Sequence, residues 1–267
     1  MRRAEEIARL TGSPVISSRK LEGGDLGGAT RLDLADGRRI VAKQGPGVAT
    51  EGAMLAALRE AGAPAPLVLH CAGELLLMEH VEAPAAASSA RWRDLACVLE
   101  RLHAPAERLY GWRVDYRFGP VAIINGEGDN WVRFWGENRL AVHAPHVGPV
   151  TRRRIEALAA RLGDLIPDHP PASLLHGDLW GGNILYAQDG VAALIDPACY
   201  YGHREVDIAM LTLFDHPPAA FFEQLSLKPD WRERLPVYRL WPLLVHLRLF
   251  GEAYRGSVDR ALTACGV

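Results

Sequence analysis

The chain has few lysines, no paired cysteines and no long uncharged apolar run. Only three of its 30 basic residues are lysines, and lysine and arginine hold phosphate differently. None of its four cysteines forms a CxxC pair, which excludes a disulfide framework and a cysteine zinc site and is typical of a reducing compartment. No apolar stretch is long enough to span a bilayer, and MRRAEEIARL carries glutamates where a signal peptide needs apolar residues. We expect a cytoplasmic protein with no membrane partner.

A basic surplus is also missing, because the formal net charge of the 267 residues is -2. Proteins that bind nucleic acid usually carry excess positive charge, so a nucleic-acid partner is not expected. Hydrophobic residues make up 49% of the chain and charged residues 23%, which is typical of a folded globular protein. The length favours one large domain or two lobes.

The N-terminal part of the chain has the pattern of a small sheet with helices. Leu32 and Leu34 alternate with polar neighbours, Ile40 to Ala42 are apolar, and Asp36-Gly37 between them is a hairpin signal. Helical periodicity marks residues 3–10 and 49–61, and apolar strands are expected at 67–70 and 75–81.

Beyond residue 80 the pattern becomes helical. The sequence therefore predicts an α+β protein with a β-rich first lobe over residues 1–80 and a larger, mainly helical second lobe over residues 81–267. Residues 174–195 interrupt the helices with two short strands and a turn. Ser88 or Ser89 can cap a helix that carries Trp92 to Leu102, and further helices are expected at 131–140, 151–163, 204–214 and 236–254.

Three polar side chains follow one another at suggestive spacings in this second part. Asp178 lies five residues before Asn183, and Asp196 follows Asn183 by 13 residues at the end of an apolar strand. Phosphoryl transfer from ATP to a hydroxyl needs one carboxylate to accept the hydroxyl proton, and a second carboxylate and an amide oxygen to hold Mg²⁺. If the two short strands form a hairpin, Asn183 and Asp196 lie near one another. Singly, each residue could instead cap a turn or end a strand.

Two neighbours of this cluster have structural interpretations. His176 is expected to be buried and to brace the loop through hydrogen bonds rather than to act as a base. Asp207, at the start of a predicted helix, is expected to hold the loop by accepting backbone hydrogen bonds. Arg204 and His203 could serve the same network.

The strings around these residues resemble a known family. His176-Gly177-Asp178 stands where protein kinases have His-Arg-Asp, and Asp196-Pro197-Ala198 stands where they have Asp-Phe-Gly. This combination resembles the aminoglycoside phosphotransferase and choline kinase branch of the protein-kinase-like fold. Within that branch, HGDLWGGN and IDPACYYGHREVDIAM are similar to the fructosamine kinase (ketosamine-3-kinase) family, and the resemblance extends over nearly the whole chain.

The resemblance implies roles for further residues. Asp178 would be the base, and Asn183 and Asp196 would hold Mg²⁺. Lys43, which alone would suggest a solvated lysine at a strand end, would anchor the phosphates of ATP, with Glu51 as its partner. The adenine would lie against the hinge residues Met78, Glu79 and His80, below a glycine-rich turn that includes Gly24 and Gly27. Trp180 would line the acceptor pocket, although large aromatic residues more often belong to the core.

The substrate implied by the resemblance is a ketosamine or a glycated lysine, which would be phosphorylated on a sugar hydroxyl. Two alternatives stay open. The first is a kinase for another small alcohol of the aminoglycoside, choline or homoserine type. The second is a pseudokinase that binds nucleotide without turnover. A monomer and a homodimer are both compatible with the sequence.

Overall fold

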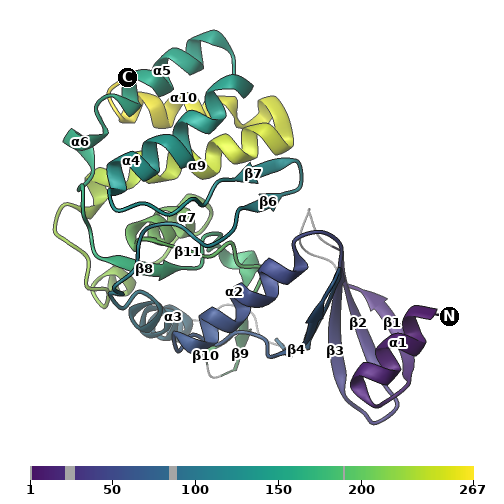
Figure 1. Ribbon diagram of the computed structural model, residues 1–267. Coiled ribbons are helices and arrows are strands. Elements are labelled where there is room, and N and C mark those ends of the chain that lie inside the picture. The colour runs from purple at the N-terminus through teal and green to yellow at the C-terminus, as the bar shows by residue number, and fades with distance from the viewer. Residues whose placement is uncertain (1, 22–27, 84–88, 189) are drawn as a thin grey trace. The chain divides into compact units, whose positions relative to one another are not determined.

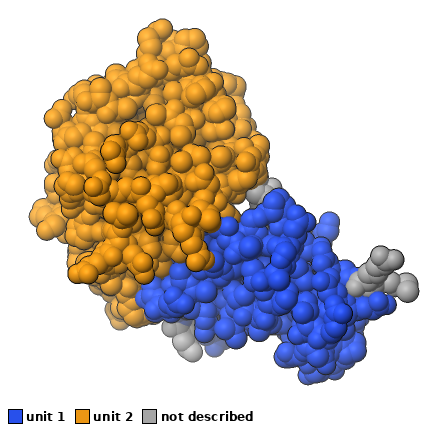
Figure 2. Space-filling model, viewed as in Figure 1, with its two compact units in different colours: residues 1–91, 182–197 blue, residues 92–181, 198–267 orange. Residues whose placement is uncertain are grey.

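The computed structural model describes residues 2–21, 28–83, 89–188 and 190–267 (Figure 1). The chain divides into two compact units, one formed by residues 1–91 and 182–197 and the other by residues 92–181 and 198–267 (Figure 2). A boundary near residue 80 would place residues 182–197 in the second lobe, whereas they group with the first unit. Among the described residues, no helix is both long and apolar enough to cross a membrane.

The first unit is built on a sheet. Its elements are α1 (Arg2–Thr11), β1 (Val15–Lys20), β2 (Ala29–Leu34), β3 (Arg39–Gln44), α2 (Val48–Glu60), β4 (Val68–Ala72), β5 (Leu75–Glu79), β9 (Ile184–Ala187) and β10 (Gly190–Leu194). Five strands form one sheet in the order β1-β2-β3-β5-β4, and every neighbouring pair is antiparallel. Gly37, with φ of 86°, makes the turn between β2 and β3 at the predicted Asp36-Gly37 position.

Strand β3 separates two environments by the alternation of its side chains. Ile40 and Ala42 belong to an apolar cluster that also includes Ile7 of α1. Successive side chains of a strand point to opposite faces, so Val41 and Lys43 face away from this cluster. The sequence IVAK therefore buries Ile40 and Ala42 in the cluster with α1 and presents Val41 and Lys43 to the other face of the sheet.

The strands β9 and β10 form an antiparallel hairpin, as predicted. Ile184 pairs with Leu194, and the Ile195 N–H donates to the Asn183 carbonyl at 3.0 Å. This last bond brings the residues just outside the hairpin, Asn183 and Asp196, to its base from opposite strands. A further backbone bond, from Leu194 N–H to Pro64 O at 2.8 Å, ties the hairpin to the segment after α2.

The second unit is mainly helical. Its elements are α3 (Ser89–Leu102), β6 (Tyr116–Phe118), β7 (Val121–Ile123), α4 (Trp131–Trp135), the π-helix η1 (Gly136–Leu140), the 3₁₀ helix η2 (Ala141–His146), α5 (Pro149–Ala159), α6 (Leu162–Leu165), β8 (Ala172–Leu175), β11 (Tyr200–His203), α7 (Glu205–Phe214), α8 (Ala219–Phe222), α9 (Trp231–Phe250), the 3₁₀ helix η4 (Gly251–Tyr254) and α10 (Arg255–Ala264). The first three residues of α3 belong to the first unit, and the 3₁₀ turn η3 (Gly181–Asn183) passes from the second unit into the first.

Aromatic side chains fill the core of this unit. Trp131 and Trp135 are fully buried, and the Trp131 Nε1–H donates to the Tyr238 hydroxyl at 3.0 Å. Arg139, also fully buried, lies 4.1 Å from the Tyr200 ring centroid and 4.9 Å from that of Trp241. The guanidinium is stabilised by these ring faces and by a 2.8 Å bond to Asn125 Oδ1. The predicted helix 131–140 is thus helical throughout, but its second half has π geometry.

Candidate active site

Lys43 is buried in the first unit and held between two carboxylates. Only 7% of it is exposed. Its ammonium nitrogen lies 2.6 Å from Glu51 Oε1 and 2.7 Å from Asp196 Oδ1. The structure therefore brings three predicted site residues together, from a strand, a helix and the end of the hairpin.

This pairing fixes the charge of Lys43. Burial by itself would lower the pKa of a lysine, but the attraction of Glu51 and Asp196 outweighs it and raises the pKa of Lys43 above its ordinary value. The side chain is accordingly an ammonium at neutral pH. A buried ammonium held at a fixed point by carboxylates is suited to binding phosphate oxygens.

The backbone places Glu51 and Asp196 for this contact. Glu51 lies in the first turn of α2, which begins after Gly47 with φ of 94°. Asp196 lies two residues after the end of β10 and has a φ of 53°, and it is the one non-glycine residue with positive φ among those described. Such a conformation is uncommon outside glycine, and asparagine and aspartate adopt it more readily than other residues. It turns the chain sharply at the residue predicted to hold Mg²⁺.

The residues at the hairpin base have the chemistry of a Mg²⁺ site. Asp196 offers a carboxylate and the buried Asn183 an amide oxygen, and Mg²⁺ prefers oxygen ligands of this kind. Within the described ranges, no group of three or more His, Cys, Asp and Glu residues could hold a metal ion by itself. Mg²⁺ commonly binds through one or two protein oxygens, with phosphates and water completing its shell. The donor set fits an ion that arrives with a nucleotide.

Asp178 lies in the second unit, in the loop after β8. This loop begins at His176, which is fully buried, and the Asp178 N–H donates to His176 Nδ1 at 3.3 Å. The expected bracing role of His176 is thus confirmed. The Ala198 N–H donates to the His176 carbonyl at 2.9 Å and ties the loop to the segment leading into β11.

Gly177 is required in this loop on two grounds. Its φ is +81°, a region that residues with a Cβ rarely adopt. A Cβ at this position would also lie 2.0 Å from the backbone oxygen of Ala198. Rotating a side chain relieves neither the backbone strain nor the clash with the Ala198 oxygen. The loop geometry therefore explains why the residue before Asp178 is a glycine.

Asp207 fixes the same loop by accepting backbone hydrogen bonds, as predicted. Its Oδ2 accepts from the His176 N–H at 2.8 Å, and its Oδ1 accepts from the Gly177 N–H at 2.9 Å. His103 Nε2 lies 2.9 Å from Oδ2 and donates, because a carboxylate can only accept. Burial opposes ionisation of Asp207, but the bond and charge of His103 and the Gly177 amide outweigh it, and the pKa of Asp207 lies below its ordinary value. His103 had no signal in the sequence.

Arg204 and His203 do not join this network, so that expectation was wrong. Arg204 pairs with Glu100 of α3, and His203 Nδ1 lies 2.8 Å from the Tyr238 hydroxyl. His203 is the last residue of β11, and Arg204 directly precedes α7. The side chains of both contact residues other than Asp207. Proximity to Asp207 in the sequence was a poor guide, since adjacent residues of a strand and a helix start do not share a face.

Trp180 is on the surface of the second unit rather than in its core. It is 39% exposed, and its ring lies 6.2 Å from that of Phe214. The following residue, Gly181, donates its N–H to Asp215 Oδ2 at 2.7 Å. A Cβ at Gly181 would lie 2.6 Å from Asp215 Oδ1, so the glycine permits this close approach.

The remaining predicted nucleotide contacts lie in and after β5 of the first unit. Met78 is buried and pairs with Val41 of β3. The Glu79 N–H donates to Leu67 O at 2.9 Å, and the His80 N–H donates to Arg39 O at 3.4 Å. Gly24 and Gly27 lie outside the described residues. The nucleotide contacts of all five residues stay predictions.

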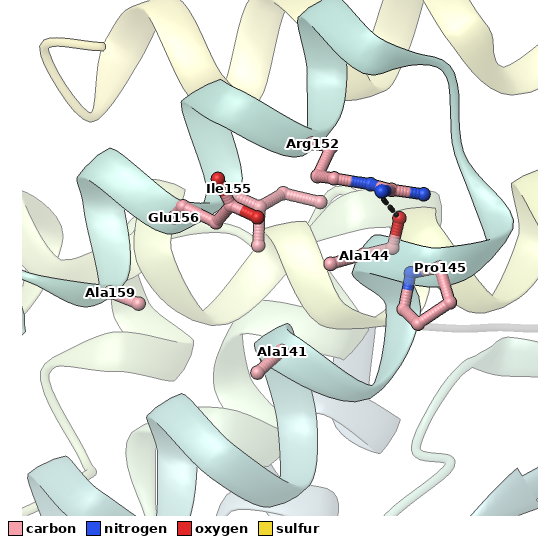
Figure 3. A pocket seen from close by; sticks show the side chains of 7 residues that line it. All are labelled: Ala141, Ala144, Pro145, Arg152, Ile155, Glu156 and Ala159. Atoms are coloured by element: carbon pink, nitrogen blue, oxygen red, sulfur yellow. Dashed lines mark hydrogen bonds between the residues drawn. The ribbon is translucent and has the colours of Figure 1, made fainter.

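A pocket in the second unit contains none of these residues. Figure 3 shows its side chains, which come from η2 and α5. Arg152 spans it with a bond from Nε to the Ala144 carbonyl at 2.9 Å. Most of the lining consists of alanine, proline and isoleucine, and we assign it no part in the chemistry.

The chain resembles proteins of one family over its whole length. It matches the family described as fructosamine kinase over residues 3–265. A Staphylococcus aureus protein named "Probable ketoamine kinase" is 32% identical to it, over 91% of this chain and 90% of that protein. An Enterococcus faecium protein with the same description is 34% identical over 71% of each chain.

Solved structures agree with the sequence comparisons. A Thermobifida fusca protein described as a "putative fructosamine-3-kinase" superposes with a TM-score of 0.89 at 31% identity, covering 98% of this chain and 97% of that one. The macrolide 2′-phosphotransferase of Brachybacterium faecium has a TM-score of 0.67 at 19% identity over 98% of each chain, and it shares the fold. The predicted α+β, protein-kinase-like fold is confirmed. The chain belongs to the fructosamine kinase family.

Proposed function

We propose that this protein is an ATP-dependent kinase that phosphorylates a sugar hydroxyl of ketosamines. The observation that carries the proposal is the buried Lys43 ammonium, held between Glu51 and Asp196 in a chain of the fructosamine kinase family. A fixed ammonium beside a candidate metal-binding carboxylate is what binding of a nucleoside triphosphate requires. The names of the ketoamine kinase relatives support the choice of acceptor.

Residues of the first unit are proposed to bind the nucleotide. Lys43 would contact phosphate oxygens, with Glu51 holding its side chain in place. Asn183 and Asp196 would hold Mg²⁺, which when bound neutralises charge on the phosphates. Met78, Glu79 and His80 would meet the adenine, and Gly24 and Gly27 would lie in the turn that covers the phosphates.

Asp178 is proposed as the base. A carboxylate can accept the proton of the attacking hydroxyl as the oxygen–phosphorus bond forms. The loop before it is fixed by Asp207 through two backbone bonds. Such fixation lowers the cost of holding the carboxylate in a productive position, because little reorganisation is left for the reaction.

We expect the acceptor to be a small ketosamine or a glycated lysine, and the enzyme to act in the cytoplasm as a monomer or homodimer. Phosphorylation of the sugar hydroxyl beside the ketosamine carbon would destabilise the adduct and release the amine. Trp180, two residues after Asp178, would stack on the apolar face of the sugar.

A panel assay tests the function. ATP consumption is measured with ketosamines of different sugar length, such as ribulose- and fructose-lysine, and with an aminoglycoside and choline. We expect turnover with ketosamines and little with the other two. Faster phosphorylation of the aminoglycoside than of any ketosamine would support the other small-alcohol kinase, and an enzyme that binds nucleotide but transfers to nothing would be a pseudokinase.

Replacing Asp196 with alanine should abolish the dependence of nucleotide binding on Mg²⁺, because the variant lacks the carboxylate proposed to hold the ion. Calorimetry of ATP binding with and without Mg²⁺ measures this. Glu74→Ala, which removes an exposed carboxylate from the β4–β5 turn of the same unit, is the control and should bind like wild type. Unchanged Mg-ATP affinity in Asp196→Ala would refute the metal-binding role.

Trp180→Ala should raise the KM for the ketosamine more than the KM for ATP, since the ring is proposed to touch only the acceptor. Steady-state kinetics with each substrate varied in turn, together with a melting curve, check this. If the ring serves only to pack against Phe214, the melting temperature should fall with no selective change in KM.

A further inference from the structure

Five aromatic side chains form a continuous row on the second unit, beginning at Trp180. We call them the aromatic row: Trp180, Phe214, His246, Phe250 and Tyr254. Ring centroids are 6.2 Å apart from Trp180 to Phe214 and 5.2 Å apart from Phe214 to His246. From His246 they are 5.5 Å to Phe250 and 4.9 Å to Tyr254. Each ring therefore contacts the next across four segments of the chain.

The row is unusual because it is exposed. Trp180, Phe214 and Phe250 have exposed fractions of 39%, 37% and 42%, and within the described part of the chain they are the three large aromatic side chains in the exposed class. His246 and Tyr254 are half-buried. The other large exposed apolar side chains are aliphatic. Contiguous exposed apolar surface of this kind commonly marks a binding site.

Specific backbone features fix the position of the row at both of its ends. The Asp215 carboxylate at the end of α7 accepts from the Gly181 N–H and so holds the Trp180 segment beside Phe214. At the other end, Gly251 closes α9 with φ of 75° and ψ of -154°, a conformation that is essentially restricted to glycine. Helix η4 then carries Tyr254 back against His246, whose Nδ1 donates to the Pro242 carbonyl at 2.7 Å.

The chemistry of a ketosamine matches this row. Its amine nitrogen is attached to C1, two carbons from the 3-hydroxyl, and as a secondary amine it is a cation at neutral pH. Aromatic ring faces attract such cations, and a row of rings can bury the apolar stem of the amine substituent. Trp180, the first residue of the row, lies two residues after Asp178 in the sequence, so the row begins beside the loop that carries the proposed base.

We propose that the rings of the aromatic row beyond Trp180 bind the amine portion of the substrate and select ketosamines whose nitrogen carries an extended apolar stem, such as the side chain of a glycated lysine. This inference rests on the proposed function, because it assigns the amine end of the same substrate. The charged groups beside the row agree with it. Asp215 adds a carboxylate near Trp180, and the cation of Arg255 is paired with Glu252.

The first test needs no variant. Two adducts of the same sugar are compared, one with methylamine and one with hexylamine. We expect the KM of the wild-type enzyme to be roughly 10-fold lower for the hexylamine adduct, since part of the longer stem is removed from water. Equal KM values for the two adducts would overturn the assignment of the row while leaving the ketosamine kinase activity intact.

Two variants then locate the effect. Phe250→Ala and Phe214→Ala should each raise the KM for the hexylamine adduct by about 5-fold or more, with a clearly smaller rise for the methylamine adduct and the KM for ATP within twofold of wild type. Phe118→Ala, which removes a half-buried ring of β6 outside the row, is the matched control and should leave all three constants unchanged. Melting curves show that each protein is folded.

The possible outcomes distinguish failure of the amine site from failure of the proposed function. Equal increases in KM for both adducts, or no increase in either row variant, would overturn the row as an amine site. A wild-type enzyme that phosphorylates neither adduct but acts on another alcohol would instead overturn the proposed function, and the assignment of the row to a ketosamine amine would fall with it.

Discussion

Asp178→Asn is expected to lower turnover by roughly 100-fold or more and to leave nucleotide binding near normal. The asparagine side chain has nearly the same shape as aspartate, but its amide cannot take a proton from the acceptor hydroxyl. The residues proposed to hold ATP belong to the first unit, whereas Asp178 belongs to the second. The loss should therefore appear in kcat, with little change in the Kd for Mg-ATP.

Single-turnover kinetics and calorimetry on the same preparation measure the two quantities. Asp164→Asn is a suitable control, because it makes the same substitution at an exposed position of α6 in the same unit. It should retain wild-type turnover. Near wild-type turnover in Asp178→Asn would remove Asp178 as the base, whatever the control shows.

Asp207→Asn should destabilise the protein by about 3–5 kcal/mol, the typical cost of removing one partner from a buried charged network. The carboxylate accepts from three donors: the amides of His176 and Gly177 and His103 Nε2. An asparagine has one acceptor oxygen, and its NH₂ group would face a donor on the other side. At least one buried N–H is left unsatisfied in either orientation of the amide.

Thermal and urea unfolding, followed by circular dichroism, measure this effect. Asp259→Asn provides the comparison, because it removes a carboxylate that is 46% exposed from an ion pair with Arg154. That change should cost at most about 1 kcal/mol. Similar stabilities for the two variants would mean that the hydrogen bonds of Asp207 do not stabilise the loop from His176 to Asp178. Turnover of Asp207→Asn should also fall, because the loop that positions Asp178 is released.

The local elements could be predicted because their causes are local. Asp36-Gly37 specifies a hairpin by its own backbone preference, and the β9–β10 hairpin follows from two apolar strands on either side of Gly190. The helix expected at 236–254 begins earlier, at Trp231, and ends at Phe250. It contains Pro236 beyond its first turn, a position that the usual preference of proline for a helix start does not suggest.

The candidate site was only partly predictable. Spacing selected Asp196, the family resemblance selected Lys43 and Glu51, and the structure brings the three together. His103 could not be found, because a histidine just after the end of α3 looks like any buried residue until Asp207, 104 positions later, is placed against it. The aromatic row is similar: its members are dispersed in the sequence from 180 to 254, and periodicity within one element does not reveal contacts among four segments.

The ion pair of Lys43 should protect this lysine from glycation. The uncharged form of an amine attacks the carbonyl carbon of a reducing sugar, and glycation of a lysine replaces its ammonium with a bulky adduct. Lys43 is buried, and its raised pKa keeps the nitrogen protonated at neutral pH. The chain offers only two other lysines. An enzyme that repairs glycated amines thus has few side chains to be damaged in this way, and the one proposed to bind phosphate is chemically protected.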